Sequence, residues 1–167
     1  MFFRLLAALM FTFAGALAGG AFSVRLWESR ELCRSIGSLF SFAAVKIRFL
    51  GTDVYELVRE AKKEQEFSRL CFIQLLPDFF VQGKDFHKEW HDALSVQELP
   101  REEQQLLEEF GNMLGRTDTE GQISGIAALN ERLGRIEAER DKNYTQKGRM
   151  YRSVGVLLGV MTGILVI

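Results

Sequence analysis

Residues 107–122 read LEEFGNMLGRTDTEGQ, and this stretch contains the end of one helix and the beginning of the next. Apolar residues recur through its first half at the spacing of three and four that marks one face of a helix. Gly115 follows them, and glycine commonly occupies the position that ends a helix. Thr117, with Glu120 three residues later, matches the capping box that opens a helix. The stretch therefore predicts a corner between two helices.

Working outward from this corner, the chain predicts an all-α fold. Proline occurs only twice, and no convincing run of alternating apolar and polar residues indicates a strand. Helices are expected over residues 24–49 and from Asp53, Ser68, Asp85, Pro100 and about Asp118. The segment SRLCFIQLLPDFFVQG, residues 68–83, is apolar nearly all round. We expect it to be the most buried element, with Pro77 kinking or ending its helix.

The expected inward faces of the other helices carry apolar residues at helical spacing. They are Cys33, Ile36, Phe40, Ala43, Ala44 and Ile47; Val54, Leu57, Val58 and Ala61; Phe86, Trp90 and Leu94; Leu106, Leu107, Phe110, Met113 and Leu114; and Ile123, Ile126, Leu129, Leu133 and Ile136. The acidic pairs Glu102–Glu103 and Glu108–Glu109 are expected on a solvated face. Cys33 and Cys71 are expected to be reduced and buried, with one disulfide in an oxidising compartment as the alternative.

Two uncharged segments flank this helical region, residues 5–24 and residues 153–167. A helix needs roughly 20 residues to cross a bilayer core of about 30 Å. The second segment is shorter and would require an upright helix or a thinned bilayer. We predict transmembrane helices over residues 1–24 and 152–167, with a helical bundle over residues 25–151 between them. A cleavable signal peptide is the alternative for the first segment.

Flanking charge predicts the orientation of these segments. The positive side chains that adjoin them on the bundle side are Arg25, Arg30, Arg34, Arg132, Arg135, Arg140, Lys142, Lys147, Arg149 and Arg152. Only Arg4 and the terminal amine lie on the other side. The positive-inside rule therefore places the bundle in the cytoplasm and both termini outside. The net charge of -1 argues against a nucleic-acid-binding protein, which is usually basic.

Glycines recur four residues apart in both uncharged segments. They are Gly15 and Gly19 in the first and Gly155, Gly159 and Gly163 in the second. Small residues at this spacing let helix backbones approach closely in lipid, although glycine is also simply common in membrane helices. We expect these faces to pack against the other span, another copy of the chain (a homo-oligomer) or another protein.

One motif suggests catalytic chemistry, the sequence HKEWH at residues 87–91. Two histidines four apart can bind zinc from one helix face. Glu89, however, fits neither HExxH nor the inverted motif, so solvated histidines beside a packed Trp90 are the simpler interpretation. The chain has no phosphate-binding GxxxxGK[ST] loop and no GxSxG elbow. We therefore expect no catalytic, cofactor or metal site, with a membrane-associated or exported metal-binding enzyme, or a generic membrane anchor for a soluble partner, as the alternatives.

The opening stretch also resembles the signature of the stage III sporulation protein AB family, roughly L-x-x-F-G-x-x-L-G-x-[ST]-D-x-x-x-Q. The residues that match it in spacing are Phe110, Gly111, Leu114, Gly115, Asp118 and Gln122. Trp90 followed by Ala93 and Leu94, and the basic, glycine-containing end KGRMYRSVGVLLGVMTGILVI, are similar as well. The resemblance covers the whole chain, from the apolar start to the apolar end.

This resemblance implies a component of the mother-cell complex that links mother cell and forespore in an endospore-forming bacterium. Its location would be the mother-cell membrane that faces the forespore. Family members look like the membrane platform proteins of type II secretion and type IV pilus systems, whose cytoplasmic domains are helical bundles. By analogy, the chain would be a non-enzymatic scaffold that anchors the sister secretion-type ATPase of its operon and contacts other components of the sporulation channel.

The signature residues can be interpreted as a structural corner or as a surface for a partner. Gly111 and Gly115 allow a close helix crossing, and Gly115 more simply ends its helix. Asp118 can accept backbone N–H groups at the start of the next helix, and Gln122 can brace that turn. The sequence favours the structural corner, with the partner surface as the alternative.

Overall fold

The computed structural model describes the backbone of residues 2–148, 150, 153, 154, 157 and 161, and the side chains of residues 24–146 and of those last five positions. The elements are α1 (Phe2–Leu50), α2 (Val54–Ala61), the 3₁₀ helix η1 (Gln65–Phe67), α3 (Phe72–Leu75), α4 (Phe86–Val96), α5 (Arg101–Met113), α6 (Thr119–Lys142) and the π-helix η2 (Asn143–Gly148). No strand occurs among the described residues, so the predicted all-α class is confirmed.

The chain divides into two compact units, and the boundary cuts through both α1 and α6. One unit comprises Leu32–Glu137, and the other comprises Met1–Glu31 with Ala138–Ile167. In the second unit the Arg30 Nε atom lies 2.6 Å from a carboxylate oxygen of Asp141, and the Arg30 guanidinium lies 5.3 Å from the centroid of the Tyr144 ring. These contacts join α1 to the end of α6 and to η2.

Among the residues that the structure describes, none of the helices combines enough length with enough apolar character to cross a bilayer. The predicted transmembrane segments, residues 1–24 and 152–167, lie outside the residues whose side chains are described, apart from Val24, Ser153, Val154, Leu157 and Met161.

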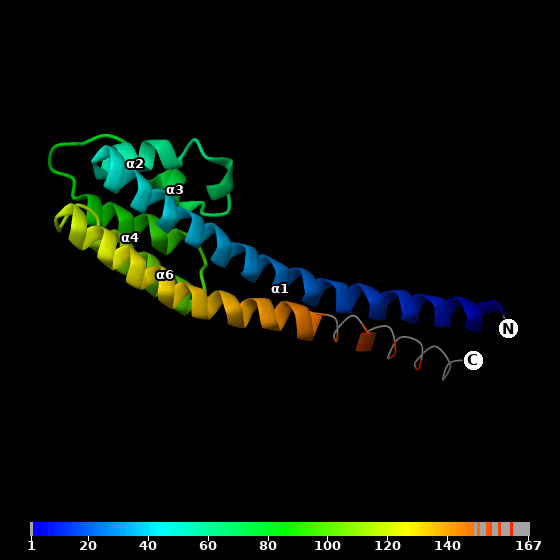
Figure 1. The fold of residues 1–167 in the computed structure, drawn as a ribbon. Coiled ribbons are helices and arrows are strands. Elements are labelled where there is room, and N and C mark those ends of the chain that lie inside the picture. The colour runs from blue at the N-terminus through cyan, green and yellow to red at the C-terminus, as the bar shows by residue number, and fades with distance from the viewer. Residues whose placement is uncertain (1, 149, 151–152, 155–156, 158–160, 162–167) are drawn as a thin grey trace. The chain divides into compact units, whose positions relative to one another are not determined.

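Aromatic residues form the centre of the Leu32–Glu137 unit. The ring of Phe110 on α5 lies 4.8 Å from that of Phe40 on α1 and 5.6 Å from that of Trp90 on α4. The ring centroid of Phe72 on α3 lies 5.3 Å from that of the same Trp90 indole. Figure 1 shows the C-terminal part of α1 with α2 and α3 along one flank and α4 and α6 along the other. The core therefore forms where helices from distant parts of the chain meet α1.

Most of the predicted inward faces are buried in this core. The members that are only partly buried are Ala44, Val54, Met113, Ile123 and Ile136. Leu39 is a buried residue of α1 that the predicted stripe lacked. The 3.6-residue period therefore predicts the buried side of each regular helix correctly.

The segment 68–83 is not the long buried helix that its composition predicts. Only Phe72–Leu75 forms an α-helix, and the side chains of Leu75, Phe79 and Phe80 are 55%, 65% and 69% exposed. Leu76 has extended geometry (ψ 148°), because a residue before proline is disfavoured in the α region. Ser68 follows the last residue of η1 and does not open a helix. Pro77 ends the helix as predicted, but the helix begins at Phe72 and not at Ser68, so the predicted long buried helix is wrong.

The side chain of Gln97, which follows α4, holds this irregular segment in place. Its Oε1 atom accepts the N–H of Phe72 at 3.3 Å, and its Nε2 atom donates to the Arg69 carbonyl at 2.8 Å. Both bonds replace contacts that a longer helix would have made internally. The local conformation thus depends on a residue about 25 positions later in the chain.

Two predictions about buried polar groups are wrong. Both cysteines are free thiols, but Cys71 is exposed, and only Cys33 is buried. Glu103 is fully buried instead of solvated, and the Cys33 Sγ atom donates to its Oε1 atom at 3.4 Å. Glu103 lies three and four residues before Leu106 and Leu107, so it belongs to the buried face of α5.

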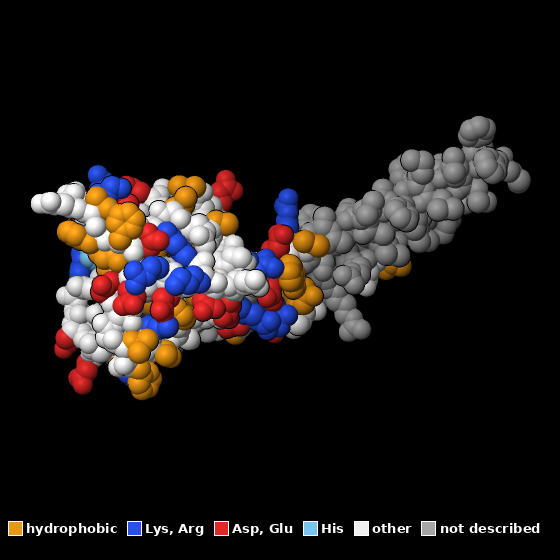
Figure 2. Space-filling view, turned by 90° about the horizontal axis from the view of Figure 1, so that it is seen from above, with side chains coloured by type: hydrophobic (Ala, Val, Ile, Leu, Met, Phe, Trp, Pro, Cys, Tyr) orange, Lys and Arg blue, Asp and Glu red, His pale blue; other side chains and the backbone are white. Residues whose placement is uncertain are grey.

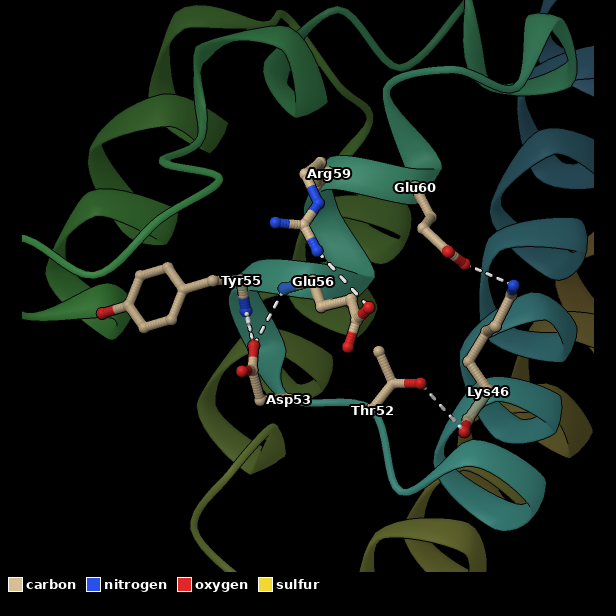
Figure 3. Close-up of polar contacts among 7 residues, drawn as sticks. All are labelled: Lys46, Thr52, Asp53, Tyr55, Glu56, Arg59 and Glu60. Carbon is tan, nitrogen blue, oxygen red and sulfur yellow. Dashed lines mark hydrogen bonds and ion pairs between the residues drawn. The ribbon is translucent and has the colours of Figure 1, made fainter.

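A compact polar corner joins α1 to α2 (Figure 3). Gly51 adopts φ 57°, where glycine avoids steric strain, and directly follows the last residue of α1. The Asp53 carboxylate accepts two backbone N–H groups of the first turn of α2, both at 2.8 Å, which confirms the predicted cap. Across the corner, Lys46 of α1 forms an ion pair with Glu60 of α2. This pair fixes α2 against α1.

The Lys46–Glu60 pair predicts an acid-dependent contribution to stability. The hydrogen bond from Lys46 lowers the pKa of the Glu60 carboxyl below its ordinary value of 4.5. A lowered folded-state pKa adds stability above that ordinary value, and the contribution is lost as the pH falls through the folded-state pKa. In urea titrations, Glu60→Gln should therefore destabilise the chain at pH 7, and the difference from wild type should shrink below pH 4.5. Lys46→Met should remove the same pH dependence, and a difference that persists unchanged in acid would contradict the assignment.

Candidate functional site

The signature residues lie together at the end of α5 and the start of α6. Phe110 and Leu114 are buried in the core. Gly111 is the buried glycine of the same helix face, and Gly115, Asp118 and Gln122 form the turn that follows. The first part of the signature therefore packs inward, and the second part builds the corner.

Gly111 allows the indole ring of Trp90 to lie directly on the backbone of α5. A Cβ atom at position 111 would come within 2.5 Å of the Trp90 Cε2 atom, a distance that real Cβ contacts do not reach. The buried Trp90 Nε1–H donates to the carbonyl oxygen of Leu107 at 2.9 Å. A buried indole N–H normally needs such a partner. The prediction of a close helix crossing at Gly111 is confirmed, and the crossing helix is α4.

His87 contributes a second bond between α4 and α5. Its Nδ1 atom lies 3.0 Å from the Gly111 carbonyl oxygen, and because a carbonyl only accepts, Nδ1 must carry the proton. This carbonyl belongs to the last turn of α5, where backbone oxygens lack partners within the helix. His87 is therefore part of the helix junction. The sequence had suggested instead that this side chain would simply be solvated.

His91 does not join His87 in a larger cluster of metal-binding side chains. It is exposed, with its Nδ1 atom 3.9 Å from a carboxylate oxygen of Glu108. Within the described part of the chain, no group of three or more His, Cys, Asp or Glu residues is arranged to hold a metal ion. The described geometry thus assigns His87 a structural contact and leaves His91 at the surface.

Gln122 braces the corner with both ends of its side-chain amide. Its Oε1 atom accepts the N–H of Gly115 at 3.2 Å, and its Nε2 atom donates to the Thr117 carbonyl at 2.9 Å. Gly115 adopts φ 71°, the left-handed conformation predicted for the residue that ends α5. The amide therefore spans the turn and fixes the direction in which α6 leaves it.

Asp118 caps α6. It directly precedes the first helical residue, and its Oδ1 atom accepts the N–H of Gly121 at 2.9 Å. The prediction that Thr117 would cap this helix is wrong by one residue, because Thr117 and Asp118 both have side chains suited to a cap. The roles predicted for Asp118 and Gln122 agree with the observed bonds.

An apolar groove of about 170 Å³ begins immediately after this corner. The C-terminal end of α1 contributes Ala44, Val45, Arg48 and Phe49. The opposite wall is formed by Ile123, Ile126, Ala127 and Asn130 of α6. Because Ile123 directly follows Gln122, the braced corner positions the α6 wall. We take the corner and this groove together as the candidate functional site.

Phe49 is the most conspicuous side chain of the groove, because 74% of it is exposed. This surface was not among the predicted sites. Val45 and Phe49, four apart, lie outside the predicted inward stripe of the first helix, and that spacing was the available signal. We therefore treat this exposed apolar face as a candidate interaction surface.

Charged side chains of both signs lie on the face of the molecule shown in Figure 2. In Figure 2, Lys and Arg side chains alternate with Asp and Glu side chains over the described part of the face shown. Arg132 of α6 pairs with Glu109 of α5, and this hydrogen bond raises the pKa of the guanidinium. Such mixing gives the face in view no strong field of one sign.

Five further candidate residues lie outside the described side chains. They are the glycines of the predicted membrane-helix packing faces, Gly15, Gly19, Gly155, Gly159 and Gly163.

The fold and its junctions define a class: a helical bundle protein whose signature residues build a glycine-dependent helix junction and an amide-braced corner. The profile of the family described as stage III sporulation protein AB (spore_III_AB) matches residues 4–167. The chain therefore belongs to the stage III sporulation protein AB family, as its resemblance predicted, and that family supports a role in stage III of sporulation. Searches of curated proteins and of solved structures found no match.

Replacing Gly111 tests the helix junction. Gly111→Ala places a methyl group against the Trp90 ring, and overpacking of this kind costs about 1–3 kcal/mol. Gly134→Ala is the matched control, because a Cβ atom there meets nothing within 4 Å, and this change should stabilise α6 by roughly 0.5–1 kcal/mol. Equilibrium urea denaturation of both variants measures the difference. Equal effects of the two changes would contradict the close contact at Gly111.

Replacing Gln122 tests the brace. Gln122→Glu keeps an acceptor for the Gly115 N–H but places a carboxylate oxygen against the Thr117 carbonyl, so we expect a loss of about 1–2 kcal/mol. Ser124→Glu adds the same charge two residues later at an exposed position of α6. The free energy of unfolding of Ser124→Glu should stay close to wild type, and the same loss in both variants would show that charge, not the amide brace, is responsible.

Proposed function

We propose that this chain is a non-enzymatic membrane platform of the mother-cell sporulation channel. In this role it holds a secretion-type ATPase at the membrane during endospore formation. The observation that carries the proposal is that the family signature belongs to the bundle's own junctions, in a chain that has an uncharged segment on each side of the bundle. A scaffold needs a rigid body and anchors, and no reacting groups.

The signature contacts support a structural role in two ways. The Trp90 ring packs directly on the backbone of Gly111, and the Gly111 carbonyl oxygen accepts a hydrogen bond from His87. The side chain of Gln122 is engaged at both ends within its own turn. Groups committed to internal bonds are poorly placed to bind a substrate or transfer a proton. The residues that mark the family thus supply rigidity.

The distribution of charge along the chain supports membrane anchoring. Residues 5–24 and 153–167 carry no charged side chain, whereas ten positive side chains adjoin these segments on the bundle side. In the proposed topology both segments cross the mother-cell membrane that faces the forespore, and the bundle lies in the cytoplasm. A cytoplasmic bundle can then reach an ATPase that works on the same side of the membrane.

Crosslinking in sporulating cells tests the partner and the topology together. A photoreactive residue at Phe80, which is 69% exposed, should capture a cytoplasmic secretion-type ATPase that mass spectrometry identifies. The same probe at the buried residue Phe110 is the control and should capture no partner. Capture of only extracytoplasmic proteins through Phe80 would invert the topology and remove the platform role.

A deletion strain provides the second readout. Removing the gene should abolish spore formation, and the wild-type chain supplied in trans should restore it. Normal spore numbers in the deletion strain would contradict the proposed role, whatever the crosslinking captures.

A further inference from the structure

We propose that the groove between α1 and α6 is the docking site for an amphipathic helix of a partner protein, and that this helix carries a carboxylate beside its apolar face. The apolar face fills the groove, and the carboxylate pairs with Arg48. This inference goes beyond the proposed function, because a scaffold can hold its ATPase through other surfaces. It rests on the Leu32–Glu137 unit, which contains every residue used in the argument.

The two walls of the groove present matching apolar stripes. Val45 and Phe49 of α1 lie four residues apart, and both side chains are exposed. Opposite them, Ile123 and Ala127 of α6 have the same spacing, and the buried Ile126 also lines the groove. Residues four apart are neighbours on a helix surface, so each wall is a continuous stripe. A third helix packs into such a seam with the apolar side chains of its own face.

The size of the groove suits the side chains of such a face. Its volume is about 170 Å³. An apolar cavity of about 150 Å³ binds benzene, so the groove accommodates a leucine or phenylalanine side chain of the partner. Docking would also remove the exposed ring of Phe49 from water, and burial of apolar surface drives most protein association.

Arg48 specifies the charge of the partner. It is the only charged residue that lines the groove. Among the residues that the structure describes, no carboxylate pairs with the Arg48 guanidinium, whereas the nearby Lys46 is paired with Glu60. A helix that covers the groove takes water away from this guanidinium, and a charge that loses its hydration needs a partner. A carboxylate meets that need, because arginine binds it through two parallel hydrogen bonds.

The arrangement of the two helices determines where this carboxylate must lie. Arg34 of α1 lies 3.6 Å from Glu137 near the end of α6, so the two helices are antiparallel, as Figure 1 also shows. Arg48 therefore stands at the Ile123 end of the groove, and Asn130 stands at the other end. We expect the partner's carboxylate at the Ile123 end and a hydrogen-bonding group at the Asn130 end.

A second copy of this chain fits the groove poorly. In the proposed function both copies are anchored through the start of α1 in one membrane, so their α1 helices are parallel. A two-fold axis along these helices would bring the groove of one copy to the same groove of the other. Arg48 would then face Arg48, and like charges placed together at an interface are unfavourable. The groove therefore favours a partner of different sequence, with an acid opposite this base.

Selection from a displayed library of helices tests the proposal. The bait is the full chain, purified in detergent micelles. All library members share an apolar face of Leu and Phe, and the positions that flank this face vary among Glu, Gln and Lys. We expect the wild-type chain to enrich Glu over Lys by at least about tenfold at one flanking position. Arg48→Glu should reverse this preference, since the ion pair re-forms with exchanged signs.

Two variants of α6 distinguish docking in the groove from nonspecific binding. Ala127 and Ala128 are adjacent and both exposed, but only Ala127 lines the groove. Ala127→Glu should weaken binding of the selected helix by at least about tenfold, because it places a carboxylate in the apolar seam. Ala128→Glu should leave binding close to wild type. Both variants add the same charge to the same helix, so a general effect of charge or of folding would appear in both.

Four results would each overturn the proposal. The first is that no helix is retained better by wild type than by Ala127→Glu. The second is that the retained helices show no excess of Glu, and the third is that Arg48→Glu keeps the wild-type preference. The fourth is self-association that Ala127→Glu abolishes and Ala128→Glu does not, which would identify a second copy as the occupant. None of these readouts depends on the ATPase or on spore formation.

Discussion

The contact between the indole ring of Trp90 and the backbone of Gly111 is the constraint on which the bundle depends. It places α4 against α5 at a distance that no other residue at position 111 would allow. The Trp90 N–H then reaches the Leu107 carbonyl, and the same ring packs against Phe110. Phe110 in turn packs against Phe40 of α1. One missing methyl group therefore sets the geometry of three helices.

The corner after α5 fixes the direction in which α6 leaves the core, and so determines the surface that α6 forms with α1. Gly115 turns the chain, Asp118 caps α6, and Gln122 joins the two sides of the turn. The next residue, Ile123, already lines the groove opposite α1. Because the family signature spans this corner, its internal contacts determine the shape of the exposed surface that follows it. Such an arrangement suits a protein that positions others.

Sequence reasoning succeeded where the governing interactions are local. The caps at Asp53 and Gly115 and the bonds of Asp118 and Gln122 join residues within about seven positions, so their chemistry can be deduced from spacing. It failed for Glu103, because acidic residues were assigned to the surface by type although the spacing placed this one on the buried face. It failed for the start of the helix in residues 68–83, because the side chain of Gln97, about 25 positions later, bonds to the backbone there.

The sequence by itself determined the helical class, the inward faces of the helices, the corner after α5 and the family. These features depend on periodicity, capping chemistry and the spacing of a few residues along one segment. Only the tertiary structure decided that Trp90 is the partner of Gly111, that Cys33 meets Glu103, and that Phe49 stands beside a groove. Each of these contacts joins residues at least 20 positions apart, and no local pattern specifies which distant side chain will fill a given space.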